Sequence, residues 1–248
     1  TETPVCSVFQ DYAFVENELV NIGKAGREFY GEAFTGASSG ATQYTFNFPN
    51  NTGTSIIEFG AVGKSVGASS QIAWSVAGAG GTVTISPVGT SSTDLYATPT
   101  GAISAFNSPG GSMSAAFQFI AGNPDANAWM DFVSINTTRE LKMSGNQMRI
   151  RDTTAIGPNA FALYPLTNTT AATKVLDITQ QYAPRWMNTT FNSNTTTWKC
   201  EHDTLHEFVV FNPSGTLTPT PIGKIQNQDL HGLSDIDLVI VTAPLHLA

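Results

Sequence analysis

The sequence predicts a mainly β protein, with a β-sandwich or jelly-roll domain followed by a second, smaller β-rich region. Short runs of apolar residues, several in strict alternation with polar ones, recur along most of the chain. Turn-forming stretches such as GAGG, SPGG and GNPD separate these runs. Many strands at short intervals, with glycine and proline between them, are typical of sandwiches and jelly rolls. No helix of useful length fits between the runs.

The N-terminal segment has a short pattern of helical spacing. Val15, Leu19 and Ile22 would lie on one face of a helix, but the pattern lasts only two turns and Gly23 interrupts it. We therefore expect a short helix or an irregular turn here, followed by a strand over residues 29–34.

Residues 1–138 are predicted to hold this segment and the sandwich domain. Tyr44, Phe46 and Phe48 alternate with polar residues and so share one face of a strand, which ends at Pro49. Further strands are predicted in the stretches TSIIEFGAVGKSV, QIAWSVAG, GTVTISPVG, GAISAF, SMSAAFQFIAG and AWMDFVSINTT.

Residues 139–213 are predicted to form the second β-rich region. Its expected strands are in ELKM, QMRIRD, FALYPL, KVLDIT and EFVVFN, while MNTTFNSNTTTWKC is typical of an exposed edge or a long hairpin. Residues 214–248 begin with a Pro/Thr linker. They end with the apolar run 238–241, which resembles the first buried strand of a parallel α/β sheet.

Composition limits the classes of partner. Of 248 residues, 12% are charged, about half the roughly 25% of an ordinary soluble domain, and the net charge is -8. An acidic chain without a basic run is a poor partner for phosphate backbones, so we expect no nucleic acid. No run of eighteen apolar residues occurs, so we expect no membrane span.

Two cysteines and two histidines are the candidates for metal or nucleophile chemistry. Cys6 and Cys200 either form one disulfide or stay as two buried thiols. His202 and His206 lie four residues apart, which on a helix would allow them to share a zinc ion. A strand pattern follows them directly, so a polar turn is the favoured interpretation. Acidic neighbours around Cys200 should raise its pKa, which argues against a nucleophilic thiol.

Other motifs are weaker. Ser65 sits in a G-x-S-x-G pattern on a predicted strand with no helix after it, so we interpret the match as coincidence. A carbohydrate-binding module would need exposed tryptophans: Trp186 and Trp198 lie in the Thr/Asn-rich stretch, whereas Trp74 and Trp129 lie in apolar strands and are expected in the core. Asp125 in GNPDAN is a single candidate ligand for calcium.

Four stretches in order resemble the gingipain-like sortases of the type IX secretion system, the PorU-type family. LVNIGKAGREFYGEAF resembles its N-terminal signature, WMDFVSINTTRELKMSGNQMRIRD a central block, and KVLDIT a later strand. KIQNQDLHGL followed by LVIVTAP resembles the passage where the peptidase domain of that family begins. The chain departs from the pattern at Thr137-Thr138-Arg139, where two arginines are common, and at Leu176, where tryptophan is common.

The resemblance implies a cell-surface enzyme of Bacteroidota that removes the C-terminal secretion signal of cargo proteins and transfers the cargo to a surface lipopolysaccharide. It implies that the catalytic Cys and His lie after later strands of the peptidase domain, which one strand cannot build. We therefore expect no catalytic residue, cofactor or metal in this chain. His231, in the linker motif, is expected to form a structural hydrogen bond.

Three hypotheses follow from the sequence. The first is the non-catalytic N-terminal region of such a peptidase, supporting the peptidase domain or docking cargo C-terminal domains or an outer-membrane β-barrel partner. The second is a sandwich that binds glycan or protein. The third is a metallohydrolase with His202 and His206 as ligands.

Overall fold

The computed structural model describes residues 3–24, 28–36, 40–154, 156–157, 161–224 and 232. The chain divides into a large unit, residues 1–216, and a small one, residues 217–248. The described part of the large unit consists of strands and loops apart from the 3-10 turn Pro213–Gly215. The predicted mainly β, sandwich-like class is therefore confirmed. In the described residues no helix has the length and apolarity needed to cross a membrane.

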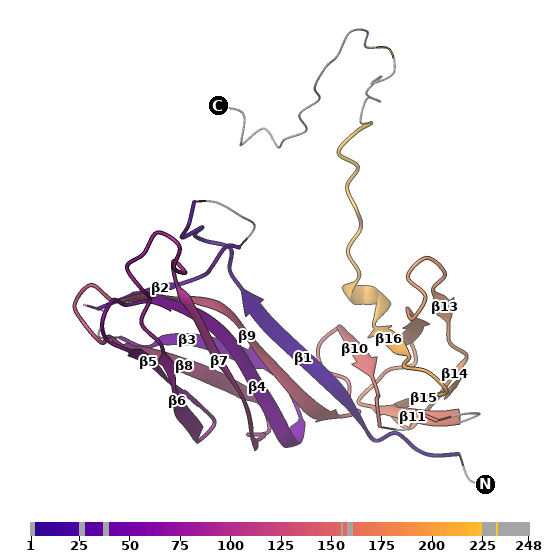
Figure 1. The fold of residues 1–248 in the computed structure, drawn as a ribbon. Coiled ribbons are helices and arrows are strands. Elements are labelled where there is room, and N and C mark those ends of the chain that lie inside the picture. The colour runs from indigo at the N-terminus through magenta and orange to yellow at the C-terminus, as the bar shows by residue number, and fades with distance from the viewer. Residues whose placement is uncertain are drawn as a thin grey trace. The chain divides into compact units, whose positions relative to one another are not determined.

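The described strands of the large unit form three antiparallel sheets (Figure 1). A large sheet has the order β13-β12-β16-β10-β1-β9-β4-β7, with β2 paired to β9; a second has the order β3-β8-β5-β6, and a third β11-β15-β14. The bounds are β1 Val8–Glu16, β2 Ala33–Thr35, β3 Thr42–Asn47, β4 Asn51–Lys64, β5 Ser70–Val76, β6 Ala79–Ile85, β7 Thr98–Asn107, β8 Ser112–Ile120, β9 Asn127–Glu140, β10 Gln147–Arg151, β11 Phe161–Thr167, β12 Lys174–Asp177, β13 Arg185–Trp186, β14 Thr189–Asn192, β15 Thr195–Glu201 and β16 Glu207–Phe211.

The first hydrophobic core lies between the large sheet and the four-stranded sheet. Phe59 of β4 contacts Phe117 of β8 and Trp74 of β5, with ring centroids 4.9 and 5.9 Å apart. Along β8 every second side chain is buried, from Met113 to Phe119. A strand that packs one face on a core and turns the other to water requires this alternation. The core therefore depends on the period-two pattern that predicted the strands.

The second hydrophobic core lies under the three-stranded sheet. Tyr164 of β11 stacks on Trp198 of β15 at 5.2 Å between ring centroids, and both rings meet Phe208 of β16 edge-on. These three side chains are at most 1% exposed. Phe9 of β1 and Leu141, which follows β9, belong to the same core. Strands β1 and β9 of the large sheet therefore connect the first core with the second.

The helix alternative for the N-terminal segment is wrong. Residues 8–16 form β1, which pairs with β9 over nine consecutive residues. Ala13 and Val15 pack against the first core, while Leu19 is 67% exposed. Pairing with β9 supplies hydrogen-bond partners along one side of β1, from Val8 to Glu16. Two helical turns would offer few such bonds. The irregular-turn alternative holds for residues 17–24, and the strand expected at 29–34 begins only at Ala33, after a bridge between Val20 and Tyr30.

The Thr/Asn-rich stretch forms the long hairpin that was predicted. β14 and β15 pair from Thr189 to Trp198, and Ser193 and Asn194 make the turn with φ values of +46° and +68°. Positive φ at both central residues is the geometry of a type I′ hairpin turn, and asparagine tolerates it better than most residues. All four residues of β14 are exposed.

The small unit is described only at residues 217–224 and 232, and residues 217–224 have no regular secondary structure. The predicted linker stays a prediction. His231 and the apolar run 238–241 lie outside the described residues, so the strand expected there stays a prediction. The domain boundaries at residues 138 and 213 also stay predictions.

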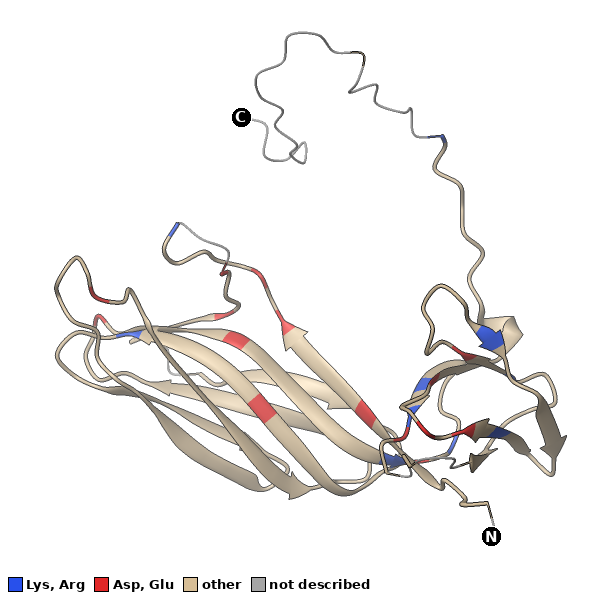
Figure 2. Cartoon of the chain, turned by 45° about the vertical axis from the view of Figure 1, so that its right-hand side comes forward, with Lys and Arg blue, Asp and Glu red and all other residues tan. Residues whose placement is uncertain are grey.

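Charge is distributed unevenly along the chain (Figure 2). Seven of the eleven Lys and Arg residues fall within residues 139–213, where six Asp and Glu residues occur, whereas residues 1–138 hold ten acidic and three basic residues. Residues 1–138 are therefore acidic overall, and residues 139–213 are close to neutral.

Candidate metal-binding cluster

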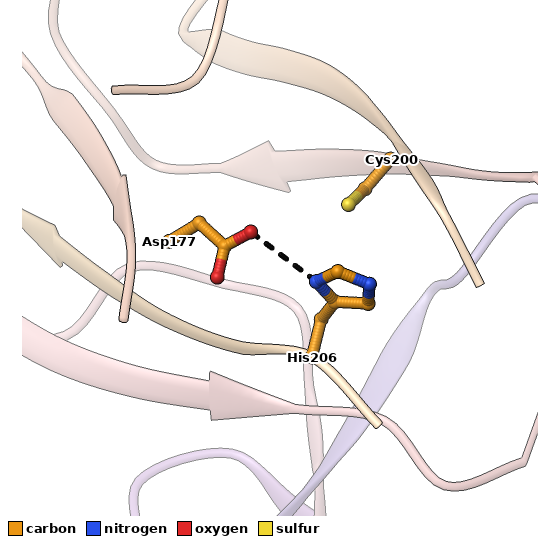
Figure 3. A group of neighbouring side chains, drawn as sticks. All are labelled: Asp177, Cys200 and His206. Atoms are coloured by element: carbon orange, nitrogen blue, oxygen red, sulfur yellow. Dashed lines mark hydrogen bonds and ion pairs between the residues drawn. The ribbon is translucent and has the colours of Figure 1, made fainter. Parts of the chain in front are cut away.

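Three potential metal ligands from distant parts of the sequence meet at the second core, to which Cys200 belongs (Figure 3). Asp177 is the last residue of β12, Cys200 belongs to β15, and His206 directly precedes β16. One ligand atom of each lies within 4.8 Å of the others, and all three side chains are buried. β12 pairs with β16, with Asp177 opposite Phe208, so strand pairing places Asp177 beside His206.

Hydrogen bonds surround the Asp177 carboxylate. His206 Nδ1 lies 3.2 Å from Oδ2, Arg185 Nη2 donates to Oδ2 at 2.9 Å, and the Thr179 N–H donates to Oδ1 at 2.9 Å. Burial opposes ionisation of Asp177, but these donors outweigh it and lower the pKa of the carboxyl below its ordinary value. Asp177 is therefore a carboxylate at neutral pH. Thr179 Oγ1 also lies 3.3 Å from His206 Nδ1, which holds the imidazole in place.

The Cys200 thiol is protonated at neutral pH in the absence of a metal. Burial raises its pKa to about 11, and the nearby Asp177 carboxylate adds to the rise. This is the direction that the sequence predicted. No hydrogen bond joins Cys200 to His206, although both residues are described. A Cys–His nucleophile needs such a bond and a lowered thiol pKa, so the arrangement does not fit nucleophilic catalysis.

A pocket of about 310 Å³ reaches the cluster from solvent. Cys200 and Arg185 line it together with Lys199, Trp186 and Met187. The Arg185 side chain is 68% exposed, so solvent reaches the edge of the cluster on this side. The pocket therefore approaches the cluster at Cys200, whereas Asp177 and His206 do not line it.

His202 does not join His206. The segment between β15 and β16 is the turn that was predicted, but both histidines are buried in it, at 0% and 8% exposure. His202 lies against the Tyr164 ring, and neither of its ring nitrogens has a hydrogen-bond partner in the described structure. The third ligand is Asp177 instead. It lies in KVLDIT, a strand that the sequence predicted, but no spacing rule connects a residue there with His206.

The remaining candidates are dispersed. Cys6 and Cys200 are both free and buried, which answers the disulfide question in favour of two thiols. Trp74 is in the core as expected and Trp129 is half-buried. Trp198 is 1% exposed, so the alternative in which it is an exposed sugar-binding side chain is wrong. Trp186 is 65% exposed. Ser65 is buried and donates to the Ala68 carbonyl, and Asp125 lies in a turn outside the metal cluster.

A second feature of the surface is the groove between β1 and β10. These strands pair at one position only, Gln10 with Arg151, so β1 has no strand partner on that side beyond Gln10 within the described residues. Tyr12 and Phe14 stack in parallel at 6.5 Å between ring centroids and are 43% and 59% exposed. The Arg151 guanidinium lies 4.2 Å from the Tyr12 ring centroid. The groove has a volume of about 300 Å³ and is also lined by Arg149.

Comparison with known proteins gives a likeness to solved structures. No protein-family model matches the chain, and no curated protein matches it. Among solved structures, dimeric latent PorU from Porphyromonas gingivalis matches with a TM-score of 0.73 and 18% sequence identity. The chain has the fold of a part of PorU. The match covers 94% of this chain and 23% of PorU, so the chain spans about a quarter of that protein. The family resemblance seen in the sequence is thus confirmed as a shared fold.

Proposed function

We propose that this chain is the non-catalytic N-terminal region of a cell-surface, gingipain-like cysteine peptidase of the sortase type, which processes the C-terminal secretion signals of type IX cargo. The observation that carries the proposal is the fold shared with PorU over 94% of the chain. The four sequence stretches that resemble the family support it independently, because they follow the family's order from the N-terminal segment to the linker.

The structure supports a scaffolding role for residues 1–216. Two cores share one continuous sheet, and β1 and β9 connect them through nine paired residues. A rigid, mainly antiparallel platform of this kind holds a following domain through its linker without contributing catalytic groups. The buried thiols fit this role, since among the described residues neither has the hydrogen-bonded histidine of a cysteine nucleophile.

The test uses the parent gene. The proposal requires the reading frame beyond Ala248 to encode further βα units with a Cys/His pair. In that protein, deletion of residues 1–216 should abolish removal of cargo signals, as substitution of the catalytic cysteine does, measured by the mass of secreted cargo. Full processing by the deletion variant would contradict the supporting role. A reading frame without a peptidase domain would contradict the assignment itself.

The groove beside β1 favours a second candidate function, docking of an extended peptide. An unpaired strand edge offers alternate backbone N–H and C=O groups to one more strand. The stacked Tyr12 and Phe14 supply apolar contacts next to it. Arg149 and Arg151 have no ion-pair partner among the described residues and would attract a carboxylate. The chemistry of the groove therefore fits an extended segment that carries acidic side chains, such as a β-strand of a cargo C-terminal domain.

This second function is tested with labelled peptides from type IX cargo C-terminal domains, by fluorescence anisotropy on the 248-residue chain. The Phe14→Ser and Arg149→Glu variants should weaken binding, each by about tenfold, the effect of losing about 1.4 kcal/mol. Ile103→Ser is the matched control, because Ile103 is 70% exposed on β7, the strand at the end of the same sheet. An equal loss of peptide affinity in the control variant and in the groove variants would contradict docking at β1.

A further inference from the structure

We propose that Asp177, Cys200 and His206 bind one zinc ion, with the fourth coordination position open to the pocket beside Cys200. The proposal departs from the sequence-based expectation that the chain holds no metal. It rests on the convergence of a carboxylate, a thiol and an imidazole within 4.8 Å, all from buried side chains on three different segments. It does not depend on the parent protein being a peptidase.

The ligand types fit zinc better than other common ions. Zinc is borderline-soft and takes thiolate, imidazole and carboxylate together, whereas calcium and magnesium prefer oxygen ligands alone. A zinc ion with one thiolate, one imidazole and one carboxylate ligand is also electrically neutral as a unit. Neutrality matters here, because a buried site with net charge is costly.

The spacing is close to that of a coordination sphere. Ligand atoms on one tetrahedral zinc ion lie about 3.3 to 3.5 Å apart, from bond lengths of about 2.0 Å to N and O and about 2.3 Å to S. Asp177 Oδ2 and His206 Nδ1 are already 3.2 Å apart. Only the Cys200 sulfur has to approach, and 4.8 Å is the upper limit of its present separation from the other two.

The surroundings provide the other parts of a zinc site. Arg185 and the Thr179 N–H hold the carboxylate, so this ligand has partners that orient it. The Thr179 hydroxyl lies 3.3 Å from His206 Nδ1, and this contact is exchanged for the metal when Nδ1 binds zinc. The pocket of about 310 Å³ reaches Cys200 and offers an entry route. Three protein ligands with an accessible fourth position are the arrangement in which zinc binds water or a small donor molecule.

The competing interpretation is a metal-free cluster, in which Asp177 pairs with His206 and Arg185 while Cys200 is a small apolar side chain. The two interpretations differ in what happens to the thiol. In the zinc site the sulfur is a thiolate bonded to metal, whereas in the metal-free cluster it stays a protonated thiol. The experiment should therefore observe the sulfur as well as the metal content.

The test uses the 248-residue chain, stripped with chelator and titrated with Zn²⁺ or with Co²⁺ as a spectroscopic probe. We expect one equivalent to bind, protons to be released, and the cobalt form to show the near-ultraviolet charge-transfer absorption of a thiolate ligand. Cys200→Ser should lose that absorption, and His206→Ala and Asp177→Asn should bind zinc at least about 10-fold more weakly. Mg²⁺ and Ca²⁺ should not compete at equal concentration.

The chain offers matched controls. Cys6→Ser removes a thiol with the same 6% exposure as Cys200, and His202→Ala removes a histidine of the same turn; both should leave binding unchanged. If Cys200→Ser does not fold, alkylation of the wild-type chain followed by peptide mass spectrometry replaces it. Zinc should then protect Cys200 and leave Cys6 unaffected. Absence of zinc binding by the wild-type chain, or loss of the cobalt absorption in Cys6→Ser instead of Cys200→Ser, would overturn the proposal.

Discussion

The guanidinium of Arg139, near the end of β9, forms an ion pair with the carboxylate of Asp11 on β1, with 2.6 Å between Nη1 and Oδ2. Their side chains are 6% and 23% exposed. Arg139 also donates from Nε to the Pro49 carbonyl at 2.8 Å and from Nη2 to Ser144 Oγ at 2.7 Å. One arginine thus connects β1, β9 and two loops at the point where the first core gives way to the second.

We predict that Arg139→Ala lowers the free energy of unfolding by about 3 kcal/mol, because it removes the ion-pair partner of the partly buried Asp11 carboxylate and the donor to the partly buried Pro49 carbonyl. Arg139→Lys should recover only part of the loss, since an ammonium cannot present three donors in a planar fork. Urea unfolding at neutral pH measures the free energy of unfolding of both variants. Arg149→Ala is the control: its side chain is exposed and unpaired in the described structure, so a change above about 0.5 kcal/mol there would contradict the argument.

The two tryptophans of the hairpin region provide the second prediction. Trp198→Ala should destabilise the chain by about 3 to 5 kcal/mol, because it empties the space between Tyr164 and Phe208 in the second core. Trp186→Ala should change stability by less than about 0.5 kcal/mol, since the side chain is 65% exposed. The melting temperatures of the two variants, measured by thermal unfolding, test this difference. Similar melting temperatures would show that Trp198 is not part of the core.

The third prediction concerns the stability of the fold at acidic pH. Burial disfavours ionisation of Glu32, but hydrogen bonds from the Tyr44 hydroxyl and the Asn17 amide outweigh burial and lower the pKa of Glu32 below 4.5. A depressed folded-state pKa stabilises the fold above pH 4.5, and this contribution is lost as pH falls through the folded-state value. Tyr44→Phe should therefore destabilise the chain at neutral pH and reduce the dependence of stability on pH below 4.5. Urea unfolding across this pH range measures the slope; an unchanged slope in Tyr44→Phe would rule out the coupling.

The fourth prediction concerns the stability of the fold at alkaline pH. Burial raises the pKa of Cys6 from 9.0 to about 12, and the Asp152 carboxyl adds to the rise. Because the folded state holds this proton more tightly, the contribution to stability is complete below pH 9 and is lost as pH rises toward 12. Cys6→Ala should therefore lose less stability than the wild-type chain between pH 9 and pH 11. Native Cys6 should also react with a thiol reagent far more slowly than in the unfolded chain, and equal rates would contradict its burial.

The sequence by itself determined the class of fold and most of the strands. Runs such as Tyr44, Phe46 and Phe48 alternate because one face of a strand packs on a core, and this cause acts within each strand. The turn at Ser193 and Asn194 is equally local, since it needs only residues that tolerate positive φ. The resemblance to the sortase family rests on short motifs in a fixed order, and it could also be recognised from the residues alone.

Only the tertiary structure decided the features that depend on distant pairing. β1 is a strand because β9 offers nine partners to its backbone, which outweighs the short helical pattern at Val15. Trp198 is buried because β11 and β16 bring the rings of Tyr164 and Phe208 against it. Asp177 meets Cys200 and His206 because β12 pairs with β16, and no local pattern records which strands become neighbours. Local periodicity reports burial, whereas a site assembled from three segments depends on strand order.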